Sequence, residues 1–285
     1  DKKQAWDDLH RLAADNDGYV RAGAVQAIGS AFSQVPDKKQ AWNDIHRLTY
    51  DAELHARTGA AKALGSAFSQ VPDKQLAWDD LVRLTNDKDS NVRAQAASAL
   101  GSAFSQVPDK QQAHKQQACD DLVRLTSDKD STMRSKAASS LSSAFSQVPD
   151  KQLAWIDLLA LTKDKDRDVK SYAASALISA FSQLSDKQKA WKDLLRLTSD
   201  EYSIVRAKAA LALGSAFSQV PDKQETWNNL HGLIGDEYSD VRSNAAYTLG
   251  SAFSQLPDKQ QALNDLLKLA SDKECNVRSE AAYAL

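Results

Sequence analysis

GSAFSQVPDK, at residues 101–110, decides the fold, because the chain repeats it from one end to the other. Its central part, AFSQVPDK, also stands at 31–38, 67–74, 144–151 and 216–223, with close variants at 180–187 and 252–259. Self-similarity at a fixed period is typical of repeat architectures, in which each unit buries its apolar face against its neighbours. Cutting the chain before each Asp-Lys pair gives eight units, at 1–36, 37–72, 73–108, 109–149, 150–185, 186–221, 222–257 and 258–285.

The fourth unit is longer than the other complete units, with 41 residues in place of 36. KQQAH at 110–114 is followed there by KQQAC at 115–119, a duplication of five residues. We expect this insertion to lengthen the first helix of the unit and to change the curvature of the array near 109–185. Position numbers below count from the opening Asp of each unit, and in the fourth unit they are matched after the insertion.

The composition argues against nucleic acid and membranes as partners. The 36 Lys and Arg residues are balanced by 38 Asp and Glu residues, so no basic excess attracts anionic polymers or lipid surfaces. No apolar run approaches the ~20 residues of a membrane span, and no signal-peptide pattern opens the chain. Cys119 and Cys275 lie four units apart, too far to form a disulfide, which suits a reducing compartment. We therefore expect a cytoplasmic protein.

Each unit contains the pattern of two amphipathic helices, most clearly in 73–108. Asp73 follows Pro72 and is a good N-cap for the first helix, and a second helix is expected to open at Asp89 or Ser90 and to run to Val107. Apolar residues recur at intervals of three and four in both segments, which is the spacing of one helix face. They are Ala77, Trp78, Leu81, Val82 and Leu84, then Val92, Ala96, Ala97, Ala99, Leu100, Ala103, Phe104 and Val107. The predicted fold class is all-α.

Residues that do not vary between units predict the core. Position 12 is Leu and position 24 is Ala in all eight units, and position 32 is Phe in the seven units that reach it. Position 6 accounts for every Trp in the chain. Small residues, including Gly at position 29 in five units, would let neighbouring helices approach closely while the Leu, Phe and Trp side chains fill the space between units. We interpret the aromatic stripe as core and not as a ligand cage.

Two charged positions accompany this pattern. Position 15 is Asp in every unit, and position 21 is Arg in every unit except the fifth, which has Lys170. The acidic residues are Asp15, Asp51, Asp87, Asp128, Asp164, Asp200, Asp236 and Asp272, and the basic ones are Arg21, Arg57, Arg93, Arg134, Arg206, Arg242 and Arg278.

Paired helices, an Asp in the turn between them and a Val-Arg sequence that starts the second helix resemble the HEAT-repeat family. The wording ALGSAFSQVPDK is similar to HEAT-like arrays of methanogenic archaea, which are related to the bilin-lyase type of HEAT repeat. The resemblance covers 1–285 as one domain and implies an α-solenoid wound as a right-handed superhelix, with second helices on the concave face. It also implies that the matching Asp and Arg residues form a ladder between units, and that the protein binds partners without catalysis. Lys170 cannot reproduce the two-pronged arginine contact, so the ladder should be weaker there.

No residue pattern points to an active site. Asp at position 8 and Arg or Lys at position 11, as in Asp80 and Arg83, are interpreted as a solvated charged face and not as part of a carboxylate dyad, because they recur in most units. His10, His46 and His231 share position 10 and are expected to be half-buried. Successive units would hold them about 10 Å apart, too far to share a zinc ion. Because no catalytic motif is present, we predict no enzyme, no cofactor and no metal site.

The second helix of each unit carries the candidate binding surface. Positions 30 and 33 are Ser and position 34 is Gln in all seven units that reach them, whereas positions 23 and 26 vary. Variable side chains on a fixed scaffold can give specificity for a protein or peptide, although drift explains the variation about equally well. The predicted contact strip consists of Lys136, Tyr172, Lys208, Leu211 and Tyr247.

Other interpretations stay open at this point. The array could be the sensing part of a larger signalling ATPase, or an engineered repeat protein. It could bind nucleic acid along a central basic track of Arg134, Lys136, Lys170, Arg206 and Lys208, which we rank low because most arginines are assigned to the ladder. The sequence starts on a unit boundary and stops within a helical pattern, which suggests a fragment of a longer array. Its uncapped apolar ends suggest end-to-end self-association.

Overall fold

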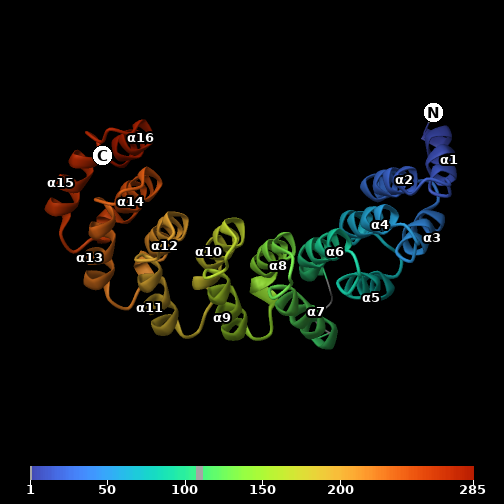
Figure 1. Cartoon of the computed structure of the whole chain (residues 1–285), viewed down its shortest axis with the longest axis horizontal. Coiled ribbons are helices and arrows are strands. Elements are labelled where there is room, and N and C mark those ends of the chain that lie inside the picture. Colours follow the sequence, from blue (N-terminus) through green and yellow to red (C-terminus); the bar gives the residue numbers. More distant parts are fainter. Residues whose placement is uncertain (1, 107–111) are drawn as a thin grey trace. The chain divides into compact units, whose positions relative to one another are not determined.

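A computed structural model describes residues 2–106 and 112–285, and within these ranges the chain is all-α, with no strand (Figure 1). The first helices of the repeats are α1 (Lys2–Leu12), α3 (Lys38–Leu48), α5 (Lys74–Leu84), α7 (Gln112–Leu125), α9 (Lys151–Leu161), α11 (Lys187–Leu197), α13 (Lys223–Leu233) and α15 (Lys259–Leu269). The second helices are α2 (Gly18–Ser30), α4 (Leu54–Ala67), α6 (Ser90–Ala103), α8 (Ser131–Ala144), α10 (Arg167–Phe181), α12 (Ser203–Ser215), α14 (Ser239–Ala252) and α16 (Cys275–Ala284). This succession of helix pairs is the α-solenoid that the sequence predicts.

The chain divides into two compact parts, Asp1–Pro149 and Asp150–Leu285. These parts are called the first unit and the second unit from here on, and the eight short units of the sequence are called repeats. The division falls between the fourth and fifth repeats, so each unit consists of whole helix pairs, α1–α8 in the first and α9–α16 in the second. Within each unit, successive second helices pack side by side. The single array over 1–285 stays a prediction.

Local signals set the helix boundaries. Asp73 caps α5 by accepting a hydrogen bond from the Leu76 backbone N–H at 2.9 Å, and Asp89 caps α6 in the same way through Asn91. Second helices end one turn earlier than predicted. α6 stops at Ala103 and continues as the 3₁₀ helix η2 (Phe104–Gln106), and the same sequence forms η1 (Phe32–Gln34), η4 (Phe145–Gln147), η5 (Phe217–Gln219) and η6 (Phe253–Gln255). The tighter turn brings the chain round to the next first helix.

The recurring apolar residues form the core, as the sequence predicts. All six tryptophans are buried, and so is every Phe of position 32 except Phe253, which is half-buried. Glycine at position 29 has a steric reason: a Cβ on Gly29 would lie 2.5 Å from the Cα of Ala63 on the next second helix. Neighbouring second helices therefore pack close enough to present one continuous face within each unit.

The insertion in the fourth repeat lengthens its first helix, as predicted. α7 has 14 residues, whereas α1, α3 and α5 have 11 each. The predicted change of curvature near 109–185 involves residues 109–111, which lie outside the described ranges, and the boundary between the two units, so it stays a prediction.

Candidate functional site

Five arginines at position 21 each join adjacent repeats through two hydrogen bonds. Arg21 donates from Nε and Nη2 to the two carboxylate oxygens of Asp51, at 2.8 and 2.7 Å, while its Nη1 donates to the Asp15 carbonyl of its own turn at 2.7 Å. The same two-pronged contact recurs at Arg57–Asp87 (2.7 and 3.0 Å), Arg93–Asp128 (2.9 and 2.9 Å), Arg206–Asp236 (2.7 and 2.9 Å) and Arg242–Asp272 (2.7 and 2.8 Å). Each guanidinium therefore links its own turn to that of the following repeat.

These carboxylates titrate below their ordinary range. Burial alone would raise the pKa of Asp51, but hydrogen bonds from the Arg21 side chain and the Glu53 backbone outweigh it and lower the pKa. The same balance lowers the pKa of Asp87, Asp128 and Asp236. At Asp272 the hydrogen bonds from Arg242 are the largest influence and bring its pKa to about 2. These five carboxylates are therefore ionised at neutral pH.

Among the remaining ladder positions, Lys170 departs from this pattern. Lys170 is buried, with its Nζ 3.0 Å from the ring centroid of Tyr202 and 3.9 Å from a Glu201 carboxylate oxygen. Arg134 and Arg278 each donate to two carbonyls of their own turn, those of residues 128 and 129 and of residues 272 and 273. Asp15, Asp164 and Asp200 each accept the backbone N–H two residues ahead.

The predicted solvated charged face at position 8 is wrong in three repeats. Asp44, Asp80 and Asp265 are only 3%, 1% and 3% exposed, so they do not belong to a solvated face. Each lies 2.6 Å from the Nδ1 of a histidine in the preceding repeat: His10, His46 and His231 respectively. The histidines are half-buried, as predicted, and their rings lie against the tryptophans Trp6, Trp42 and Trp227 of their own helices. These pairs form a second set of contacts between repeats.

Arginines at position 11 of the first unit also bridge repeats. Arg47 donates to the Ala13 carbonyl at 2.8 Å, and Arg83 donates to the Thr49 hydroxyl at 2.7 Å and to its carbonyl at 3.3 Å. Arg124 reaches the carbonyl and hydroxyl of Thr85, both at 3.4 Å. Each guanidinium thus covers the carboxyl end of the preceding first helix, where carbonyl groups lack helical partners. This position is structural in repeats two to four.

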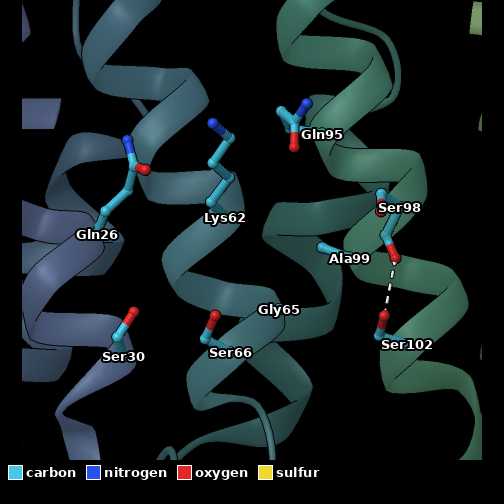
Figure 2. A pocket seen from close by; sticks show the side chains of 9 residues that line it. All are labelled: Gln26, Ser30, Lys62, Gly65, Ser66, Gln95, Ser98, Ala99 and Ser102. Carbon is cyan, nitrogen blue, oxygen red and sulfur yellow. Dashed lines mark hydrogen bonds between the residues drawn. The ribbon is translucent and has the colours of Figure 1, made fainter. Parts of the chain in front are cut away.

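A polar hollow of about 370 Å³ opens on the second-helix face of the first unit. Figure 2 shows Gln26 from α2, Lys62 from α4 and Gln95 from α6 in one row, with Ser30, Ser66 and Ser102 in a row below. Gly65, Ser98 and Ala99 complete the lining. The hollow exists because small residues form its floor and long amide and ammonium side chains form its rim. Among the described residues Lys62 is its one charged group.

None of the five residues of the predicted contact strip lines this hollow. Lys136 lies on α8 of the first unit, and the other four lie in the second unit, Tyr172 on α10, Lys208 and Leu211 on α12, and Tyr247 on α14. Tyr172 and Tyr247 are exposed, and the other three are half-buried. Tyr247 lines a separate hollow of about 290 Å³ with Gly250, Ser251, Tyr283 and Ala284. Four of the five predicted residues therefore belong to one compact unit, and the structure defines relative positions for these four only.

The basic track is largely unavailable for nucleic acid. Arg134 and Lys170 are 6% and 3% exposed, and Arg206 is held by Asp236. Lys136 and Lys208 are the two members that remain at the surface, half-buried on separate helices. Two cations are too few to neutralise a run of phosphates.

Neither a membrane helix nor a metal cluster is found in the described parts of the chain. None of the helices there is long and apolar enough to cross a bilayer. No group of three or more His, Cys, Asp and Glu side chains in 2–106 and 112–285 is placed to hold a metal ion.

Comparison with known proteins agrees with this architecture. A family model described as HEAT repeats matches residues 6–101 and 79–178, which together span more than half of the chain. A crystal structure described as an engineered protein is similar over 97% of this chain and 76% of its own, with a TM-score of 0.56 and 24% sequence identity. At that identity the likeness concerns the fold. No curated protein matches the chain.

Proposed function

The chain belongs to the HEAT-repeat family, and on that premise we propose that it is a non-catalytic scaffold that binds an extended peptide of a partner protein on its second-helix face. The observation that carries this proposal is the polar hollow across α2, α4 and α6. Stacked helical repeats form extended binding surfaces, and polar groups that converge in a concave site fix the orientation of a ligand.

The chemistry of the hollow suits a peptide backbone. Gln26 and Gln95 each offer an amide donor and an amide acceptor, which match the N–H and C=O groups of an extended chain. Ser30, Ser66 and Ser102 are exposed and add hydroxyls that can donate or accept. Lys62 has no ion-pair partner among the described residues, and an acidic side chain on the peptide would supply one. We therefore propose that the ligand is an extended, acidic peptide and that the protein binds it in the cytoplasm.

A library of random peptides displayed on phage tests this proposal. Peptides selected on the wild-type chain should bind a Gln26→Ser, Lys62→Ser, Gln95→Ser variant at least about tenfold more weakly, because its rim is removed. The three side chains make no contact in the core, so the melting temperature should stay unchanged.

The matched control replaces the four exposed and half-buried residues of the predicted strip in the second unit, in a Tyr172→Ser, Lys208→Ser, Leu211→Ser, Tyr247→Ser variant. If the hollow is the site, this variant binds the selected peptides as the wild type does. Loss of binding in this variant alone would move the site to the second unit. Selected peptides without Asp or Glu would contradict the assigned role of Lys62.

A further inference from the structure

Another pocket lies between α11 and α13, on the first-helix side of the second unit, and it shares no lining residue with the polar hollow or with the hollow at Tyr247. Its volume is about 350 Å³, and its lining consists of Thr198, Ser199, Asn228, Asn229, Gly232 and Leu233. These are positions 13 and 14 of the sixth repeat and positions 7, 8, 11 and 12 of the seventh. In the first unit, position 11 carries the arginines that bridge to position 13 of the preceding repeat.

The pocket lies where repeats two to four have the arginine of position 11. Position 11 of the seventh repeat is Gly232, and a Cβ built on this glycine would meet no atom within 4 Å. The Thr198 carbonyl therefore receives no guanidinium from the next repeat, whereas those of Thr49 and Thr85 do. The neighbouring position 8 changes as well, from Asp to Asn229. Both charges of the usual Asp–Arg pair are thus absent, and open space is left in their place.

The acceptors that the arginine would use are still present. Thr198 is buried at the carboxyl end of α11, where carbonyl groups carry partial negative charge. Its hydroxyl lies 2.6 Å from the Leu195 carbonyl and 3.2 Å from Asn229 Oδ1, and the Asn229 amide nitrogen donates to the Glu225 carbonyl at 2.8 Å. These contacts fix the Asn229 amide with its oxygen toward Thr198. The Thr198 carbonyl and Asn229 Oδ1 therefore offer acceptors to a planar donor.

We propose that this pocket binds the guanidinium group of an arginine side chain that a partner protein supplies. The arginines of repeats two to four show, within this same chain, which group fills the equivalent space and which atoms receive it. A planar group with several N–H donors fits a carbonyl and an amide oxygen better than a compact ammonium does. Because no lining residue carries a charge, an isolated guanidinium ion should bind weakly. Its selectivity over an ammonium ion comes from the hydrogen-bond geometry.

Titration of the ¹⁵N-labelled chain with methylguanidinium tests the proposal directly. At constant ionic strength and up to about 50 mM ligand, the amide signals of Asn229, Gly232 and Ser199 should shift together with a Kd of about 10 mM. Methylammonium and neutral methylurea should shift them at least about fivefold less at equal concentration. Equal shifts with methylurea would overturn the assignment to a cation, and no saturable shift with methylguanidinium would overturn the site.

Four variants sharpen the result. Gly232→Arg fills the pocket with the chain's own guanidinium and should abolish the shifts, whereas Gly235→Ala, at another open glycine outside the pocket, should leave them unchanged. Asn229→Asp keeps the pocket open and should tighten methylguanidinium binding about fivefold, which keeps the test valid if Gly232→Arg does not fold. Arg83→Gly should create a new methylguanidinium response at Thr49 in the first unit. Unaltered binding in Gly232→Arg, or no gain in Asn229→Asp, would contradict the proposal.

Discussion

Two neighbouring junctions in the second unit hold a cation at position 21 by different means. Between the sixth and seventh repeats, Arg206 donates two hydrogen bonds to the Asp236 carboxylate. Between the fifth and sixth repeats, Lys170 lies against the Tyr202 ring and only 3.9 Å from Glu201. Both junctions have an Asp at position 15 and a Tyr at position 17, so the cation is the difference that matters.

The repeat therefore tolerates a change of partner but keeps a positive charge of low exposure at this position, since the Lys170 and Arg206 side chains are 3% and 11% exposed. A lysine ammonium cannot bind both carboxylate oxygens as the guanidinium does, so it gains stabilisation from the face of an aromatic ring. The equivalent Tyr238 is 5.6 Å from the Arg206 guanidinium, at the edge of that interaction. Burial of the charge is thus supported by hydrogen bonds at one junction and by a cation–π contact at the other.

Asp236→Ala should be the most damaging substitution in this comparison, because it leaves the Arg206 guanidinium, on a side chain that is only 11% exposed, without its carboxylate. Loss of one partner of a buried pair costs about 3 kcal/mol. Asp200→Ala is the matched control: both aspartates accept the backbone N–H two residues ahead, but Asp200 receives no two-pronged arginine contact. It should cost about 1 kcal/mol, the value of one hydrogen bond.

Hydrogen exchange measured repeat by repeat is the suitable readout, because opening of an array is local and a single unfolding free energy is poorly defined. Protection of α12 and α14 should fall in Asp236→Ala much more than protection of α10 and α12 falls in Asp200→Ala. Equal losses at the two junctions would mean that the guanidinium contact adds little to stability.

Tyr202→Ala should have the next largest effect. Tyr202 and Tyr238 both occupy the N-cap position of their helices without a side-chain cap, so their backbone roles are matched. Removal of the ring from over the buried Lys170 should cost about 2 kcal/mol, whereas Tyr238→Ala should cost less than about 1 kcal/mol. Hydrogen-exchange protection of α10 and α12 in Tyr202→Ala, and of α12 and α14 in Tyr238→Ala, compares the two variants.

Tyr202→Phe keeps the aromatic face and should retain most of the stability, and a double-mutant cycle with Lys170→Met isolates the coupling between the two side chains. A coupling near zero would assign the cost of Tyr202→Ala to packing and would remove the proposed compensation for the lysine.

Periodicity explains how much of the fold could be predicted from the sequence. Trp78, Leu100 and Phe104 recur at fixed positions and fit one face of a helix, so their burial follows from the pattern alone. The boundaries between repeats could be predicted in the same way, from the Pro-Asp pair that recurs at most of them. The early end of the second helices could not be predicted, because Phe-Ser-Gln is compatible with both an α-helix and a 3₁₀ turn.

Contacts between repeats were harder to predict, since they depend on how far one repeat is shifted along the next. The pairing of His46 with Asp80 requires that position 10 of one repeat meets position 8 of the following one, and an Asp that recurs in nearly every repeat gives no hint of this. The hollow presents the same difficulty. Gln26, Lys62 and Gln95 are variable positions in the sequence, but the space between them depends on how closely Gly65 and Ala99 let α4 and α6 approach.

Acidification should give the smallest effect and one with a defined sign. The pKa of Asp272 is about 2 in the folded chain, below the value of about 3.9 for an unfolded aspartate. Folding therefore favours the ionised form, so the contribution of the Arg242–Asp272 pair is fully present above about pH 4 and is lost as the pH falls toward 2. In Asp272→Asn this contribution is absent at every pH. The difference in hydrogen-exchange protection of α14 and α15 between wild type and Asp272→Asn should accordingly be largest at pH 5 and shrink toward pH 2. The difference between wild type and Arg242→Ala should shrink over the same pH range. A difference that stays constant over this range would mean that the negative charge of Asp272 does not carry its contribution to the junction with Arg242.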